Sequence, residues 1–192
     1  MQEFEEHLIP NRIRTIRKKL NLTLDELASK INMSRAYVSK LERSRKAPPI
    51  STLFKIAKSL NVDLNYLITG ISGQYNNQKV SLVAEDEQLG VIHQRSSYGY
   101  IYKALAYKKN NKLMEAFKII VPSKEEQEPF IHDGEEFNYL LKGKARVFVD
   151  GEWYLMNEGD SIYYDSALPH YAVSIGGKEA IFLQVNTQPK NK

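Results

Sequence analysis

Residues 23–43 have the sequence TLDELASKINMSRAYVSKLER, and this stretch decides the architecture of the first part of the chain. Apolar residues recur at helical spacing from Leu24 to Ile31, and the pattern restarts with Val38 and Leu41. The break between the two patterns is only a few residues long. We therefore predict two short helices joined by a tight turn.

The ends of these helices are marked by residues with well-defined local roles. Thr23 and Ser34 stand where N-cap residues are expected, because their hydroxyl oxygens can accept from free backbone N–H groups. Asn32 lies at the turn, where a residue that tolerates a positive φ is favoured. The second helix should therefore span about Arg35 to Arg43 and present an outer face to solvent.

Two short helices are not stable alone, so neighbouring helices are required. An amphipathic pattern from Ile9 to Leu20 predicts one before them. Two prolines follow them, and a fourth helix with Ser51 as its cap is predicted next. A fifth, short helix is predicted after Asp63, ending at Gly70. Five helices in this span indicate a small bundle.

Charge and composition divide the 192-residue chain into two parts. Residues 1–70 contain 13 of the 27 Lys and Arg but 7 of the 23 Asp and Glu, a net charge of +6, which leaves −2 for the remainder of a chain with net charge +4. We predict a basic domain over 1–70, a linker rich in Gly, Asn, Gln and Ser over 71–79, and a second domain over 80–192. A basic helical domain indicates an anionic partner.

The composition also bears on location. The chain has no cysteine, which excludes disulfides and thiolate metal sites and is compatible with the cytoplasm. Its N-terminus is acidic where a signal peptide would be basic, and no apolar run approaches the roughly 18 residues that a membrane span needs. We predict a cytoplasmic protein with no membrane partner.

Residues 12–68 resemble the DNA-binding domain of the XRE (phage repressor and Cro-like) helix-turn-helix family. Ala28 and the pair Leu41 and Glu42 fall where that family has them. The resemblance implies binding of double-stranded DNA and a buried pair between Arg17 and Glu42. The alternative is a small helical bundle whose basic residues form only a solvated face.

In a helix-turn-helix module the second helix enters the major groove, and its N-terminal residues meet base edges. Here Val38 and Leu41 should face the bundle and leave the opposite surface free. The predicted base-facing residues are Arg35, Ala36, Tyr37, Ser39 and Lys40. The predicted phosphate contacts are Thr23, Ser34, Arg43, Arg45 and Lys46. One module of this size has too small an interface for useful specificity, so a homodimer is predicted.

Beyond the linker, short alternating apolar segments recur between turn signals such as Asp150-Gly151 and Glu158-Gly159, which predicts an all-β barrel or sandwich. His132 and Glu136 are four residues apart, so on one strand they would share a face, with Gly134 allowing a bend. Together with His170 they provide two imidazoles and one carboxylate, a ligand set of mononuclear non-haem iron sites.

These segments resemble the two signature motifs of the cupin family over about residues 98–186, with His132, Glu136, Gly143 and His170 at matching positions. Phe130 stands where the first motif has another histidine, so the resemblance implies a three-ligand site. Such a site would take a divalent metal such as Fe, Zn, Mn or Ni. The alternative is a barrel that retains the motif but binds no metal.

Four further residues are candidates for lining a ligand pocket or supporting the metal ligands: Tyr102, Phe130, Asn138 and Tyr164. The fold class predicted for the whole chain is α+β and multidomain, with an N-terminal five-helix bundle and a C-terminal all-β cupin (double-stranded β-helix) barrel. The favoured function is sequence-specific transcriptional regulation, with the cupin domain sensing a small molecule, a metal or both.

The alternative function is enzymatic. The chain is also similar in length and domain order to the hydroxypropylphosphonate epoxidase family of non-haem iron enzymes, and this resemblance implies iron at His132, Glu136 and His170. However, the helical-domain lysine of that family aligns near Asn21. An enzyme also has no need for Arg35 and Lys40 on an exposed helix face.

Overall fold

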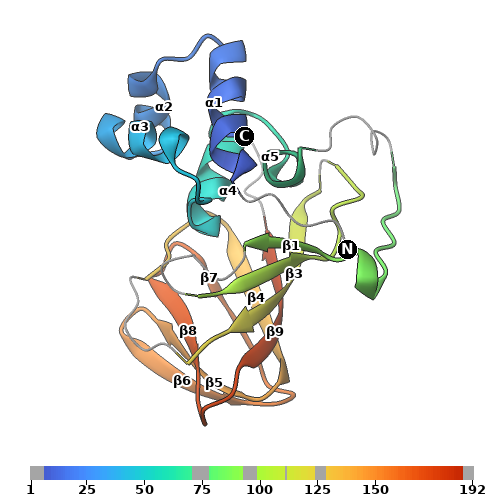
Figure 1. The fold of residues 1–192 in the computed structure, drawn as a ribbon. Helices are drawn as coiled ribbons and strands as arrows, with labels where there is room; N and C mark the ends of the chain where they lie inside the picture. The colour runs from blue at the N-terminus through green and yellow to red at the C-terminus, as the bar shows by residue number, and fades with distance from the viewer. Residues whose placement is uncertain (1–6, 71–77, 93–98, 111, 124–128, 188–192) are drawn as a thin grey trace. The chain divides into compact units, whose positions relative to one another are not determined.

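The structure of the chain is a computed structural model that describes residues 7–70, 78–92, 99–110, 112–123 and 129–187 (Figure 1). The chain divides into two compact units, Met1–Asn77 and Gln78–Lys192. Residues 71–77 of the predicted linker lie outside the described residues. No helix in the described part of the chain combines the length and apolar character needed to span a membrane.

The described residues of the first unit, 7–70, form five short helices, as predicted (Figure 1). They are α1 Leu8–Lys19, α2 Leu24–Lys30, α3 Arg35–Arg43, α4 Ile50–Ser59 and α5 Leu64–Thr69. Their apolar stripes meet in a core whose fully buried members include Ile13, Leu27, Val38, Leu53 and Leu67. The helices are individually too short to be stable, so this shared core holds the unit together.

Three of these helices are followed, two residues after their last residue, by an asparagine with a left-handed backbone. Asn21, Asn32 and Asn61 have φ angles of 54°, 54° and 51° and follow α1, α2 and α4. In each case the next residue donates its backbone N–H to a carbonyl of the last helical turn, as Met33 does to Ala28 (2.9 Å). This arrangement satisfies carbonyls that the helix leaves free, which confirms the prediction for Asn32.

Two of the predicted helix caps are confirmed and one is wrong. Thr23 and Ser34 accept hydrogen bonds from the backbone N–H groups of Glu26 and Tyr37 (both 3.1 Å). The predicted cap at Ser51 is wrong, because α4 begins at Ile50. Its N-cap residue is Pro49, whose fixed φ suits the start of a helix without a side-chain hydrogen bond.

The second unit is built from antiparallel strands after a short 3₁₀ helix, Glu85–Glu87 (Figure 1). The strands are β1 Leu89–Ile92, β2 Ile101–Ala104, β3 Met114–Val121, β4 Glu135–Lys142, β5 Lys144–Val149, β6 Glu152–Asn157, β7 Ser161–Asp165, β8 His170–Ser174 and β9 Ala180–Thr187. One sheet has the order β1-β2-β3-β9-β4-β7 and the other β6-β5-β8. In the described residues the two sheets are not closed into one continuous ladder, but their arrangement is cupin-like.

Alternation along the strands separates an interior from an exposed surface. On β9, Ala180, Phe182, Gln184 and Asn186 are buried, and the residues between them are partly exposed. The strands β3 and β4 lie on either side of β9, and their inward-facing residues follow the same order. They are apolar toward the end of β9 that contains Ala180, as Leu140 is, and polar toward the end that contains Asn186. The strand registers therefore gather buried polar side chains at one end of the interior.

Candidate metal centre and nucleic-acid interface

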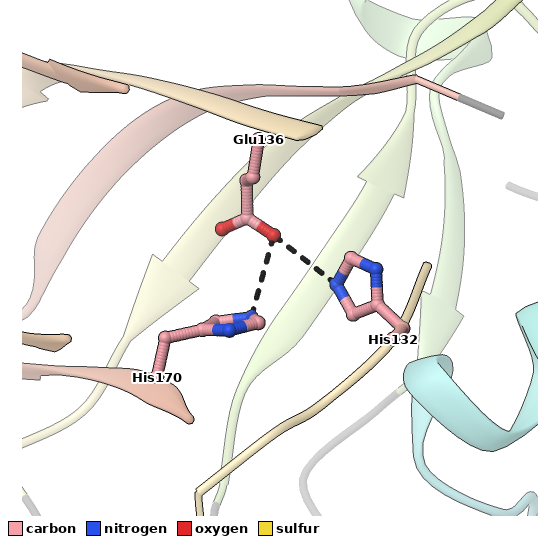
Figure 2. A group of neighbouring side chains, drawn as sticks. All are labelled: His132, Glu136 and His170. Atoms are coloured by element: carbon pink, nitrogen blue, oxygen red, sulfur yellow. Dashed lines mark ion pairs between the residues drawn. The ribbon is translucent and has the colours of Figure 1, made fainter. Parts of the chain in front are cut away.

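Three buried side chains converge in the interior of the second unit: His132, Glu136 and His170 (Figure 2). The Oε2 atom of Glu136 lies 3.3 Å from Nε2 of His132 and 3.6 Å from Nε2 of His170. One potential ligand atom from each residue lies within 4.8 Å of the others. The structure therefore brings together the three residues that the sequence singled out.

The path of the backbone between His132 and Glu136 differs from the prediction, because the two residues do not lie on one strand. Glu136 lies on β4, but His132 precedes that strand and is held by a hydrogen bond from its backbone N–H to the carbonyl of Ser166 (3.0 Å). The chain bends at Gly134, where φ is +98° and an added Cβ would lie 2.4 Å from the carbonyl oxygen of Thr187. The two ligands thus meet across a bend and not along one strand.

Three donors hold the other oxygen of Glu136. Its Oε1 accepts from Nδ2 of Asn138 (2.8 Å), the hydroxyl of Tyr164 (2.5 Å) and Nε2 of Gln184. Because Oε1 is occupied by these groups, Oε2 is the oxygen that faces the two imidazoles. Asn138 and Tyr164 were candidates from the sequence, whereas Gln184 was missed.

Backbone carbonyls orient both imidazoles. Nδ1 of His170 lies 2.8 Å from the carbonyl of Leu168, and Nδ1 of His132 lies 3.2 Å from that of Asp133. Protons on the Nδ1 atoms leave the Nε2 lone pairs directed at the centre of the cluster. Fixing of the tautomer in this way is the usual role of groups around a metal-binding histidine.

The electrostatics of the cluster favour the deprotonated forms that a metal requires. Burial alone would raise the pKa of Glu136, but in acid the protonated His132 donates a hydrogen bond to it, and the positive charges of His170 and His132 also act, so that its pKa is lowered to about 2. Burial lowers the pKa of His170, which outweighs the opposing effect of Glu136. At neutral pH the cluster therefore offers a carboxylate and a neutral imidazole. The residues fit a divalent cation, which this cluster could hold.

The remaining candidates, Tyr102 and Phe130, lie among aromatic rings of the same interior. Phe130 exchanges two backbone hydrogen bonds with His170, and its ring centroid is 5.6 Å from that of Tyr100. Tyr102 packs edge-on against Phe117, with 5.9 Å between the centroids. Phe130, which stands where the cupin motif has a further histidine, therefore adds an apolar wall beside His170.

On the first unit, α3 separates a buried face from an exposed one. The buried residues of α3 are Val38, Leu41 and Glu42. Its exposed residues are Arg35, Ala36, Lys40 and Arg43, and two residues are partly exposed, Tyr37 and Ser39. Arg45 and Lys46, in the loop after α3, are also exposed. The predicted base-facing and phosphate-facing residues of α3 and its loop therefore lie on accessible surface.

Thr23 and Arg35, two of the predicted contact residues, interact with acidic side chains of α2. The hydroxyl of Thr23 donates to Oε2 of Glu26 (2.8 Å), and its backbone N–H donates to the same atom (2.7 Å). Nε of Arg35 lies 3.2 Å from Oδ2 of Asp25. Asp25 and Glu26 lie in the first turn of α2 and are not among the contact residues predicted from the sequence.

Comparison with known families divides the chain in the same way as the structure. The helix-turn-helix family matches residues 13–67, and the cupin domain family matches residues 117–186. The first range contains α2 and α3, and the second contains all three residues of the candidate metal cluster.

Individual relatives extend these matches. The uncharacterised HTH-type transcriptional regulator y4dJ of Sinorhizobium fredii is 32% identical over 62 residues, which cover 32% of this chain and 80% of the relative. The HTH-type transcriptional regulator SutR of Escherichia coli is 24% identical over 171 residues, 88% of each chain. This second match spans both units.

Solved structures support the fold. A crystal structure of an HTH_3 family transcriptional regulator from Vibrio cholerae has a TM-score of 0.68 and 23% identity, covering 97% of this chain and 98% of the other. Hydroxypropylphosphonic acid epoxidase from S. wedmorenis has a TM-score of 0.49 and 18% identity over 96% and 100% of the two chains.

Proposed function

This chain belongs to the helix-turn-helix transcriptional regulators and carries a cupin domain, and on that premise we propose which of its residues bind DNA and what the cupin domain senses. The observation that carries the proposal is the division of α3 into a buried face and an exposed basic face. α3 enters the major groove of double-stranded DNA, and its outer residues contact base edges.

The side chains on that face suit different base edges. Arg35 and Lys40 can donate to O6 and N7 of guanine, Ser39 can contact either kind of base pair, and Ala36 can touch a thymine methyl group. Tyr37 lies at the margin of the face. Phosphates are contacted by the caps and the following basic residues: Thr23, Ser34, Arg43, Arg45 and Lys46. Two such modules in a homodimer supply the contact area that a specific operator requires.

The cupin domain serves as the sensor in this proposal. A small-molecule effector binds in its interior beside Tyr102, Phe130, Asn138 and Tyr164, with or without a divalent cation held by the cluster of His132, Glu136 and His170. Iron, zinc, manganese and nickel all accept imidazole and carboxylate ligands. A bound cation would supply a Lewis-acidic centre that an oxygen atom of the effector can approach. The effector changes the affinity for the operator only to the extent that its own affinity differs between the two conformational states of the protein.

The decisive experiment measures DNA binding by the full chain. Duplexes are selected from a randomised library with the parent protein, and the dissociation constant for the selected duplex is then measured at several salt concentrations. The double variant Arg35→Ala with Lys40→Ala should bind it at least about 30-fold more weakly, because two contacts of about 1–3 kcal/mol each are lost.

A matched control removes two charges from another exposed surface, with Arg14→Ala and Lys18→Ala on α1. This variant should retain the preference for the selected duplex. Affinity of the parent should fall steeply with salt, because phosphate contacts release counterions. Failure to select any sequence, or equal losses in both double variants, would contradict the proposal.

A further inference from the structure

We propose that Asp25 is a positioning residue that orients the Arg35 side chain for base recognition; this inference rests on the proposed function of α3. Asp25 is the second residue of α2, and Arg35 is the first residue of α3. The turn between the two helices brings Oδ2 of Asp25 to 3.2 Å from Nε of Arg35. The pair thus links the first turns of the two helices of the helix-turn-helix.

The atoms that form the pair determine what it can do. An arginine side chain has five N–H donors arranged in a planar fork, and Asp25 contacts the single nitrogen on the inner side of that fork, Nε. The end edge of the guanidinium, where the two terminal nitrogens present a pair of parallel N–H donors, lies across the central carbon from Nε and is not the contact that Asp25 makes. O6 and N7 of guanine accept two hydrogen bonds from such a pair of donors. Asp25 therefore restrains the guanidinium without occupying the donors that a guanine needs.

Arg35 has few other restraints within the described unit. It is the first residue of its helix, the first turn of α3 contains no acidic residue, and its side chain retains 66% of its exposed area. The Asp25 side chain is similarly open, at 70%. An exposed ion pair of this kind is weak and favours one side-chain orientation by only about two- to fivefold. That bias is large enough to change base discrimination and too small to fix the fold.

Pairing with Arg35 favours discrimination between base pairs, but the negative charge of Asp25 lowers the overall affinity for DNA. A carboxylate beside the DNA-binding face repels phosphates, so it weakens binding to every sequence. If Asp25 positions Arg35, its removal should therefore tighten binding to non-specific DNA and also reduce discrimination at the base pair that Arg35 contacts. An acid that served only the α2 helix dipole would give the first effect without the second.

The test is a double-mutant cycle on the full chain with Asp25→Asn, Arg35→Ala and the combined variant. Each protein is titrated with the duplex selected by the parent and with duplexes in which each base pair is changed in turn, at one fixed salt concentration. The discrimination ratio at the base pair identified by Arg35→Ala should fall about two- to fivefold in Asp25→Asn. In the Arg35→Ala background, Asp25→Asn should change the affinity for all duplexes by the same factor. Asp25→Glu should restore part of the lost discrimination.

Glu26→Gln provides the matched control, because it removes one negative charge from the same turn while its side chain contacts Thr23 and not Arg35. It should shift all duplexes equally. Unchanged discrimination in Asp25→Asn, or the same loss in both backgrounds, would overturn the inference and leave base recognition by Arg35 standing. If Arg35→Ala itself loses no discrimination, that part of the proposed function and this inference both fail.

Discussion

Arg17 and Glu42 form a buried bidentate ion pair that ties α1 to α3. Nε and Nη2 of Arg17 donate to the two carboxylate oxygens of Glu42 at 2.6 and 2.8 Å, and Nη1 donates to the carbonyl of Leu22 (2.7 Å). The side chains retain only 10% and 4% of their exposed area. The pair that the XRE resemblance implied is thus confirmed, and it lies directly behind the exposed face of α3.

Replacement of Glu42 by alanine should destabilise the helical unit by about 3–5 kcal/mol, because it leaves the Arg17 guanidinium buried without a counter-charge. Urea denaturation followed by circular dichroism at 222 nm measures the loss. Arg14→Ala, one turn earlier on the exposed side of α1, is the control and should change stability by no more than about 0.5 kcal/mol. A similar small change for Glu42→Ala would mean that the pair does not hold the unit together.

The helix-turn-helix could be predicted closely from sequence because its signals are local. The cap at Ser34 and the turn at Asn32 lie within a few residues of the helix ends that they define, so the predicted span of Arg35–Arg43 agrees with α3. Asp25 and Arg35 are ten residues apart along the chain, and neither has a periodicity that identifies the other. Their pairing depends on the angle between two helices, which sequence spacing does not specify.

Only part of the candidate metal cluster could be predicted, because some of its contacts also depend on how distant segments pack together. The three residues were found from their types and from the cupin motifs, and the bend at Gly134 was expected, but His132 lies before β4 and not on one strand with Glu136. Its place depends on a hydrogen bond to the distant Ser166, which sequence spacing does not specify. Gln184 was missed because its inward direction follows from the pairing of β9 with β4, where it lies opposite Asn138. An alternating pattern on β9 was visible, but it does not identify the neighbouring strand.

Glu26 should make the stability of the helical unit depend on pH. Hydrogen bonds from the backbone and side chain of Thr23 lower the pKa of Glu26 from its ordinary value of 4.5. A lowered pKa stabilises the folded state above pH 4.5, and this contribution is lost as the pH falls through the folded-state value. Glu26→Gln should therefore be less stable than the parent at pH 7, and the difference should shrink below pH 4.5. Urea midpoints at both pH values test this, and a constant difference would contradict it.

Gly134 should tolerate no side chain. Gly134→Ala would place a Cβ 2.4 Å from the carbonyl oxygen of Thr187 at a φ of +98°, so backbone strain and a clash add together. We expect a loss of about 3 kcal/mol or more in the stability of the β unit, measured by denaturation followed by Trp153 fluorescence. Gly151→Ala is the matched control: its φ is +93°, but no atom lies within 4 Å of the added Cβ. It should lose only about 1–2 kcal/mol, and equal losses would show that the contact with Thr187 is unimportant.

Tyr164 should tune metal affinity without being a ligand. Its hydroxyl donates to Oε1 of Glu136 at 2.5 Å, which helps to direct Oε2 at the two imidazoles. Tyr164→Phe removes this hydrogen bond and leaves His132, Glu136 and His170 in place, so affinity should fall about 10- to 100-fold, the usual effect of losing a group that orients a metal ligand. Calorimetric titration of chelator-treated protein with Zn²⁺ or Ni²⁺ measures the change.

The neighbouring Tyr163 supplies the control for this measurement. Its side chain is 60% exposed, and alternation along β7 places it on the opposite face from Tyr164. Tyr163→Phe should therefore bind the metal as the parent does, whereas His170→Ala should not bind it measurably. If the parent itself binds neither ion, the cluster is a structural remnant. If Tyr164→Phe equals the parent, the other two donors, Asn138 and Gln184, are sufficient to orient Glu136.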